Sequence, residues 1–186
     1  MANIPALFDL TGRTALITGG SRGLGKEMAM AFAEAGADLM IASRSMESCE
    51  STAAEIEAAT GRRVIPYACH VGRWNEVDGL AEAAWDQLGG VDILVNNAGK
   101  SPLYDHISNV NEQLWDSVIG LNLKGPFRLS AVLGTKMFER GKTDGRRSSI
   151  INISSIAAIH PTPDVIPYTA AKAGLNAMTI GFAQTF

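Results

Sequence analysis

The sequence predicts an α/β fold in which helices cover both faces of a doubly wound parallel sheet, giving three layers. Two observations support this class. Short apolar runs alternate with longer amphipathic runs along all 186 residues, and the short runs contain almost no polar positions. Strands that are apolar throughout are buried on both faces, as in parallel sheets. Regular alternation of strand and helix builds right-handed βαβ units. Because we find no repeat and no inter-domain linker, we expect one domain over residues 1–186.

The predicted strands are the short apolar segments that are bounded by polar or glycine-containing stretches. Their order along the chain leaves room for a helix after almost every strand, as a doubly wound sheet requires. These segments are residues 14–18, 38–43, 63–69, 91–95 and 149–153.

The predicted helices fill the intervals, and glycines at several of their ends indicate where they stop. They are residues 23–35, 46–59, 74–88, 113 to about 138, and 168 onward. The polar, glycine-containing stretch 141–147 is predicted to be an exposed loop. Phe186 lies inside an apolar helical pattern, so we expect the chain to be a fragment of a longer parent.

Composition excludes several classes of protein. A hydrophobic content of 46% with 19% charged residues allows a sizeable core and argues against disorder. A net charge of −3 argues against a nucleic-acid partner, and no basic amphipathic or long apolar run indicates a membrane. Cys49 and Cys69 lack metal-ligand spacing, and residues 1–10 lack a basic signal segment. We therefore expect a cytoplasmic protein with two reduced thiols and no metal.

A glycine-rich stretch, TGGSRGLG at 18–25, joins the first predicted strand to the first predicted helix. Glycines at this place allow a tight turn and close approach of a pyrophosphate, and the helix N-terminus offers free N–H groups. The pattern predicts a dinucleotide site; an ordinary glycine-rich turn is the alternative. The residues expected to bind the cofactor are Gly19, Ser21, Arg22, Gly23, Leu24 and Gly25.

The end of the second predicted strand indicates which dinucleotide is bound. An acidic residue there would bond the ribose 2′-hydroxyl of NAD, but this chain has Ser43 and Arg44. A guanidinium suits a 2′-phosphate, and Arg22 would add a second positive charge. We therefore predict NADP(H) rather than NAD(H). The alternative for both arginines is a solvated surface charge.

Tyr168 and Lys172 are four positions apart on a predicted helix, so they lie on one face. A nearby ammonium stabilises a phenolate and lowers the pKa of a tyrosine, which lets the tyrosine exchange protons with an alcohol or carbonyl oxygen. Ser155 follows the fifth predicted strand, at the edge where doubly wound sheets bind ligands. Its hydroxyl is a candidate for holding a substrate oxygen; the alternative is a turn cap.

The ordered motifs resemble the short-chain dehydrogenase/reductase family and its Rossmann-type fold along the whole chain. They are TGGSRGLG at 18–25, NNAG at 96–99, Asn122, SS at 154–155 and YTAAK at 168–172.

The resemblance implies roles for these residues. Tyr168 would be the general acid or base, and Lys172 would also bond the nicotinamide ribose. Ser155, thirteen residues before Tyr168, would orient the substrate oxygen. Asn122 would hold a water in a proton relay; the alternative is an amide satisfied by backbone groups. The residues that would line the cofactor site after strand four are Asn96, Ala98 and Gly99.

The sequence departs from the family pattern in two places. Strand three ends in Cys69-His70-Val71, where the family has an acidic residue before the valine. His70 and Val71 are still expected at the adenine, but the histidine contact is in doubt. The family also continues with further strands and a segment that holds the nicotinamide. We therefore expect this chain to lack C-terminal strands and a substrate lid.

The resemblance implies reversible hydride transfer between NADP(H) and a secondary alcohol or ketone, as in a carbonyl reductase or alcohol dehydrogenase. Residues 100–108 and 156–167 are expected to shape the pocket of this small-molecule substrate. It also implies a homo-oligomer, either a dimer or a tetramer. The alternatives are an NADP(H)-binding sensor or scaffold without turnover, and an inactive truncated form.

Overall fold

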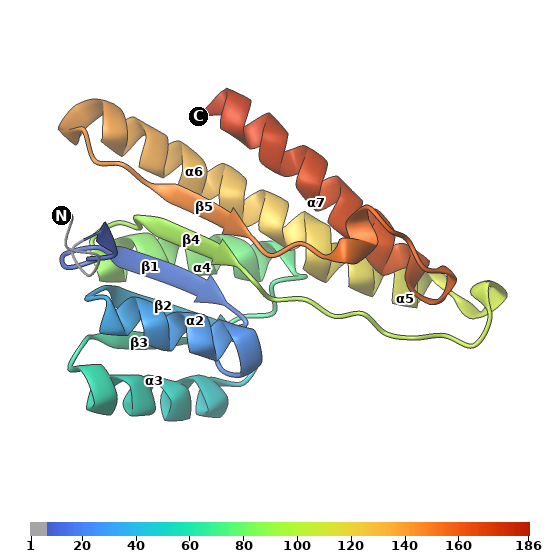
Figure 1. Cartoon of the computed structure of the whole chain (residues 1–186), viewed down its shortest axis with the longest axis horizontal. Coiled ribbons are helices and arrows are strands. Elements are labelled where there is room, and N and C mark those ends of the chain that lie inside the picture. The colour runs from blue at the N-terminus through green and yellow to red at the C-terminus, as the bar shows by residue number, and fades with distance from the viewer. Residues whose placement is uncertain (1–6) are drawn as a thin grey trace.

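The computed structural model of the chain describes residues 7–186 and has a five-stranded parallel sheet at its centre (Figure 1). The sheet order is β3-β2-β1-β4-β5, and every neighbouring pair is parallel. The five predicted strands are confirmed, with ends shifted by at most two residues. They are β1 (Thr14–Thr18), β2 (Asp38–Ser43), β3 (Val64–Ala68), β4 (Ile93–Asn96) and β5 (Ser149–Asn152).

Helices cover both faces of this sheet, as the fold class requires. The α-helices are α2 (Gly23–Glu34), α3 (Met46–Thr60), α4 (Trp74–Leu88), α5 (Glu112–Ile119), α6 (Gly125–Asp144) and α7 (Ile166–Thr185). A π-helical turn, η2 (Gly120–Lys124), joins α5 to α6. The short 3₁₀ turns are η1 (Ile107–Asn109), η3 (Ile156–Ala158) and η4 (Pro163–Val165).

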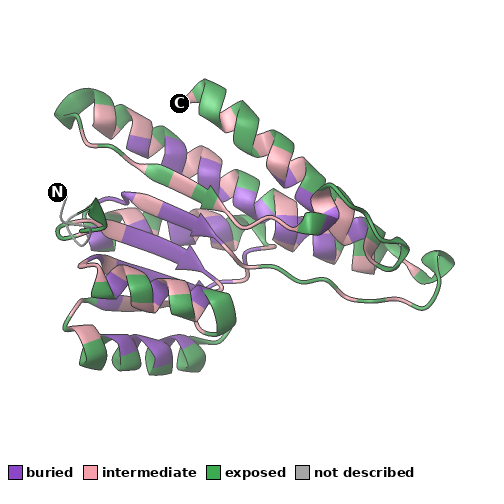
Figure 2. Cartoon of the chain, viewed as in Figure 1, coloured by how far each residue is buried: buried purple, intermediate pink, exposed green. Residues whose placement is uncertain are grey.

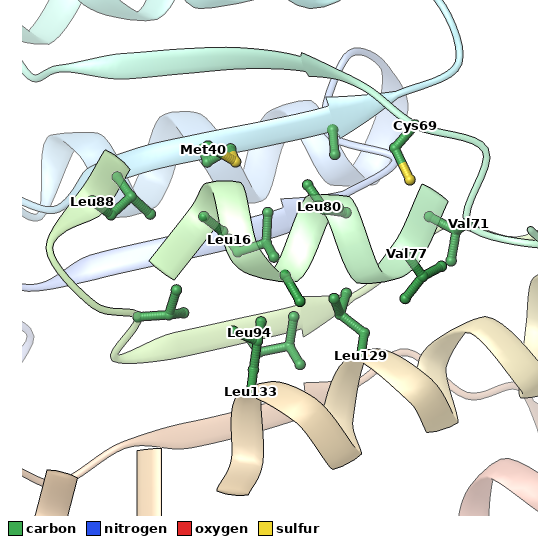
Figure 3. Packing of buried hydrophobic residues seen from close by; sticks show 14 of the residues in the cluster. Leu16, Met40, Cys69, Val71, Val77, Leu80, Leu88, Leu94, Leu129 and Leu133 are labelled. Carbon is green, nitrogen blue, oxygen red and sulfur yellow. The ribbon is translucent and has the colours of Figure 1, made fainter. Parts of the chain in front are cut away.

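Two separate clusters of buried side chains hold the layers together. Alternate residues of a strand point to opposite faces, so Ala15 and Ile17 join the cluster under α2 and α3, whereas Leu16 joins the one under α4 and α6. Figure 3 shows Leu80 of α4 and Leu129 of α6 packed against this second face. The central strands are buried on both sides, whereas β5 at the edge is partly exposed (Figure 2).

The strand order indicates where on the sheet a ligand is expected to bind. The chain runs from β1 outward to β3, and it then returns to the other side of β1 to form β4 and β5. Loops after β1 and β4 therefore leave in opposite directions and open a crevice at the carboxyl ends of these strands. Doubly wound sheets bind ligands at such a switch point.

The predicted long helix and the loop after it need correction. The helix is interrupted by η2 and continues to Asp144 rather than to about residue 138. Residues 141–144, predicted to be loop, form its last turn, where Lys142 pairs with Glu139. Gly145, with φ of +72°, ends the helix. This turn is polar because it is exposed to solvent. Polar residues are common on the exposed face of a helix as well as in a loop, so composition did not distinguish the two.

No helix within residues 7–186 has the length and apolar character needed to cross a bilayer. Residues 1–6, part of the amino-terminal stretch that was considered for a signal segment, lie outside the described residues.

Candidate active site

A cleft of about 570 Å³ opens at the carboxyl ends of β1, β2 and β4, over the switch point. Most residues predicted to bind a dinucleotide line this cleft. They are Gly19, Ser21, Arg22, Gly23, Leu24, Gly25, Arg44, Val71, Ala98 and Gly99. The sheet thus brings together segments that lie up to 80 positions apart in the sequence.

Hydrogen bonds join the glycine loop to the end of β4. The Thr18 hydroxyl accepts from the backbone N–H groups of Asn97 (3.0 Å) and Ala98 (3.1 Å). The Asn97 side-chain amide donates to the carbonyl oxygens of Thr18 (2.9 Å) and Gly19 (3.3 Å). The floor of the cleft is therefore a rigid junction of two loops.

Gly25 allows the start of α2 to lie directly on the glycine loop. A Cβ at this position would overlap the carbonyl oxygen of Gly19 and would lie 2.6 Å from the Asn97 Nδ2 atom. Neither neighbour is a free side-chain end, because the first is backbone and the second is held by two hydrogen bonds.

We expect Gly25→Ala to lower the free energy of unfolding by about 1–3 kcal/mol and to weaken NADPH binding, because the added methyl overpacks a rigid junction. Gly181→Ala is the matched control, since nothing lies within 4 Å of a Cβ at that helical position. The control is expected to stabilise the chain by about 0.5–1 kcal/mol. Urea denaturation and NADPH titration measure both, and a Gly25→Ala protein as stable as wild type would contradict the assignment.

The cleft carries positive charge without a compensating carboxylate. Arg22, Arg44 and Lys100 are exposed cations in its lining, and no Asp or Glu is among the lining residues. Within residues 7–186 these three side chains form no ion pair. The amino end of α2 opens into the same cleft, and its N-cap residue makes no side-chain cap. Free N–H groups and unpaired cations together favour an anionic ligand.

Four residues predicted to contact the cofactor are absent from the cleft lining: Asn96, His70, Tyr168 and Lys172. The Asn96 side chain is 2% exposed and donates to Ser130 Oγ (3.0 Å) and Asn152 Oδ1 (2.8 Å), so it ties β4 to α6 and β5. His70 Nδ1 accepts from the Gly72 N–H at 3.1 Å within a tight turn. The Asn96 and His70 side chains therefore have local structural partners.

Lys172 lies one helical turn after Tyr168 in α7, and its side chain is buried. Only 4% of the residue is exposed, and Nζ donates to the Ile153 carbonyl oxygen at 2.6 Å. Nζ is also 5.6 Å from the centroid of the Tyr168 ring. Burial lowers the pKa of the Lys172 ammonium, because desolvation disfavours the charged form. The predicted phenol and amine are therefore neighbours in a partly dry environment.

Asn122 lies in the π-helical turn and is fully buried. Its amide donates to the carbonyl oxygens of Lys100 and Val118, both at 2.9 Å, and its Oδ1 accepts from the Lys100 N–H at 3.2 Å. A Cβ placed on Gly99 would lie 2.8 Å from Asn122 Oδ1 and 3.8 Å from Lys172 Nζ. Asn122 therefore holds the loop after β4 beside the Lys172 ammonium. Single π-helical turns within helices are frequent at functional sites.

The two serines after β5 have different partners. Ser155 Oγ accepts from the Ala157 N–H at 3.2 Å and begins η3, which packs against α7. Ser154 Oγ donates to Asn176 Oδ1 of α7 at 2.6 Å. Ser155 thus has the capping contact that was the alternative to its substrate role, and Ser154 is engaged in holding α7.

Sequence reasoning missed several residues of the cleft. Ser45, Ser48 and Leu121 line it, and Thr18 supports it from below. Lys100, which was predicted to shape the substrate pocket, also lines this cleft, whereas no local signal marks Leu121 of η2. Among the described residues no group of three or more His, Cys, Asp or Glu side chains is arranged to hold a metal ion.

Comparisons with known proteins agree with this arrangement. The family model described as short chain dehydrogenase matches residues 13–186. Dehydrogenase/reductase SDR family member 4 from Sus scrofa is 32% identical over 174 residues, which are 94% of this chain and 60% of the relative. The chain thus spans about three-fifths of the length of this curated relative.

Two solved structures are similar in fold and sequence. A metagenomic short-chain oxidoreductase in complex with NADP has a TM-score of 0.88 at 32% identity, over 95% of this chain and 77% of that one. L-Sorbose reductase from Gluconobacter frateurii, complexed with NADPH and L-sorbose, has a TM-score of 0.89 at 30% identity. The match covers 96% of this chain and 65% of that one.

Proposed function

The chain belongs to the short-chain dehydrogenase family, and from that premise we propose that the whole protein transfers hydride reversibly between NADP(H) and a secondary alcohol or ketone. One observation carries the proposal: the buried Lys172 ammonium lies beside the Tyr168 ring, next to a cationic cleft over the switch point of the sheet. The structures crystallised with NADP and with NADPH and L-sorbose support the same chemistry.

The residues of the cleft fit a phosphorylated dinucleotide. Gly25 lets the start of α2 lie directly on the glycine loop, where a Cβ would overlap the Gly19 carbonyl oxygen, and the free N–H groups at the start of α2 suit a pyrophosphate. Arg44, with no acidic neighbour in the lining, suits a 2′-phosphate better than a free ribose hydroxyl. When bound, NADPH would supply the hydride, and the protein supplies placement and electrostatics.

The side chains of this chain then handle the proton and the substrate oxygen. In carbonyl reduction Tyr168 donates its phenolic proton to the oxygen, and in alcohol oxidation it accepts a proton. The Lys172 ammonium stabilises the phenolate form, an interaction strengthened by its burial. Ser155, at the start of η3 against α7, hydrogen-bonds the reacting oxygen. Asn122 fixes the neighbouring backbone of Lys100 and thereby the wall of the site.

The direct test is a panel of ketones, aldehydes and secondary alcohols, with NADPH or NADP⁺ followed by absorbance. We expect turnover with at least one member. NADPH binding without turnover across the panel would instead support the sensor or scaffold. A 186-residue chain that melts without cooperativity and without an NADPH-dependent shift would support an inactive truncated form.

Replacing Arg44 with Ser is expected to weaken NADPH binding about 10- to 100-fold, because a charge-assisted hydrogen bond to the 2′-phosphate contributes about 1.5–3 kcal/mol. NADH, which lacks that phosphate, is expected to bind almost unchanged. Isothermal titration with each nucleotide measures the difference.

Arg147→Ser is the control for this substitution, because Arg147 is exposed and lies outside the cleft. It removes the same charge and should leave both affinities unaltered. Equal losses for NADPH and NADH in Arg44→Ser would count against recognition of a 2′-phosphate.

A further inference from the structure

One tyrosine joins the two loops that flank the candidate catalytic residues. The Tyr104 hydroxyl donates to the carbonyl oxygen of Pro163 at 2.7 Å and accepts from the backbone N–H of Ile166 at 2.9 Å. The partners lie 59 and 62 positions later in the sequence. The phenol therefore bridges the loop after β4 and the loop before α7, which extend side by side in Figure 1.

The contact with Ile166 gives a hydrogen-bond acceptor to a backbone N–H at the amino end of α7, the helix that carries Tyr168. Ile166 is the first residue of α7, and the residue before it, Val165, has no side chain able to cap. The first N–H groups of a helix have no partner inside the helix and need one outside it. Tyr104 supplies this cap from a distant loop, two residues before Tyr168.

The same loop is fixed at its other end beside Lys172. Asn122 bonds both the N–H and the carbonyl oxygen of Lys100, and Gly99 approaches the Lys172 ammonium. Residues 100–104 thus connect the surroundings of the amine to the helix end next to the phenol. Moving Tyr104 relative to Lys100 would change how Tyr168 is presented to that amine.

We propose that Tyr104 is a positioning residue, which holds the start of α7 and the two pocket loops in the geometry that Tyr168 needs. This role rests on the proposed function. Tyr104 does not line the cofactor cleft, and the hydrogen bonds of its hydroxyl go to the backbone of Pro163 and Ile166, through which it acts. A catalytic group misplaced by about 1 Å can lose about 100-fold in rate, so a modest loosening is measurable.

Tyr104→Phe removes the hydroxyl and leaves the ring. We expect kcat/KM for the carbonyl substrate to fall about tenfold, mainly through kcat, while the KM for NADPH stays within about twofold. Hydrogen exchange of the peptide covering residues 159–168 should become at least about fivefold faster, because the Ile166 N–H loses its acceptor.

Tyr67→Phe is the matched control. It deletes the same atom from β3, and in the described part of the chain the Tyr67 hydroxyl forms no hydrogen bond. The control should leave both measurements unchanged. A Tyr104→Phe protein with wild-type kcat/KM overturns the proposal, as does an equal loss in both variants, which would reflect general destabilisation.

The outcome separates this role from the proposed function. If the wild-type protein turns over no carbonyl compound while binding NADPH, the proposed function fails and Tyr104 has no reaction to position. If wild type is active and only hydrogen exchange responds to Tyr104→Phe, the hydroxyl is a structural cap and the positioning role is refuted.

Discussion

Replacing Tyr168 with Phe is expected to lower kcat by about 10²- to 10⁴-fold, the range that a positioned general acid contributes. The substitution removes the hydroxyl and keeps the ring that packs near Lys172 Nζ. Under the proposed mechanism, no group would remain at that position to protonate the developing alkoxide, so the chemical step would slow. NADPH binding should persist, because the cleft is built by β1, β2, β4 and their loops.

The measurement pairs steady-state kinetics with an NADPH-dependent shift in melting temperature for the same preparation. Tyr67→Phe again serves as the control for loss of a phenol without loss of the site. A Tyr168→Phe protein that keeps more than a tenth of wild-type kcat would assign proton transfer to another group. Loss of the thermal shift together with activity would mean that the variant is misfolded around the cleft.

The second large effect concerns the stability of the fold at the amino ends of the strands, the end of the sheet away from the cleft. The Asp92 carboxylate is 1% exposed and accepts hydrogen bonds from the guanidinium groups of Arg140 (2.8 Å) and Arg146 (2.5 and 2.6 Å). It also accepts from the Thr14 N–H at 3.0 Å, and Arg13 lies 3.6 Å away. This carboxylate therefore ties β1, β4, the end of α6 and the loop before β5 together.

Asp92→Asn is expected to lower the free energy of unfolding by about 3–5 kcal/mol, the usual cost of removing one partner from a buried ion pair. The substitution is nearly isosteric, but it leaves Arg140 and Arg146 without their anion and turns an amide donor toward guanidinium donors. Urea denaturation at pH 7 measures the loss. Asp86→Asn, at an exposed position with no ion pair in the described structure, is the control and should change stability by less than about 0.5 kcal/mol.

The loss should also depend on pH. Burial alone would raise the Asp92 pKa, but the hydrogen bonds from Arg146 and Thr14 and the charges of Arg140 and Arg146 outweigh it, so the pKa is held below 3.8. A depressed folded-state pKa adds stability that is fully present above about 3.8 and is lost as the pH falls through the folded-state value. The difference between wild type and Asp92→Asn should therefore shrink below pH 4. A difference that stays constant from pH 7 to pH 3 would contradict this assignment.

Much of the fold was predictable because its signals are local. The apolar runs of β1 and β2 and the glycines that end α3 and α4 are readable within a few residues, and these elements were predicted with small errors. The π-turn at Gly120–Lys124 was not predictable, since it arises where the helix passes close to the backbone of Val71 and Gly72. The predicted homo-oligomer and cytoplasmic location stay predictions.

Most residues that were predicted to bind the cofactor line one cleft, but the hydrogen bonds that several of them make were not predicted. The glycine loop, Arg44 and Gly99 reach one cleft as expected, because the carboxyl ends of parallel strands share an edge. Asn96 and Asn97 are adjacent in one motif, yet the first faces the interior and the second faces the cleft. Their alternation follows from the pleat, but which of the two faces the ligand depends on the sheet as a whole.

The sequence by itself determined the alternation of strand and helix, the glycine turn and the spacing of Tyr168 and Lys172, because these depend on intervals of a few residues. Only the tertiary structure decided that Tyr104 caps α7, that Asn122 holds Lys100 and that Asp92 gathers three arginines. Each of those contacts joins groups that are far apart in the sequence. They meet, and stabilise the fold, only when the helices have packed on the sheet.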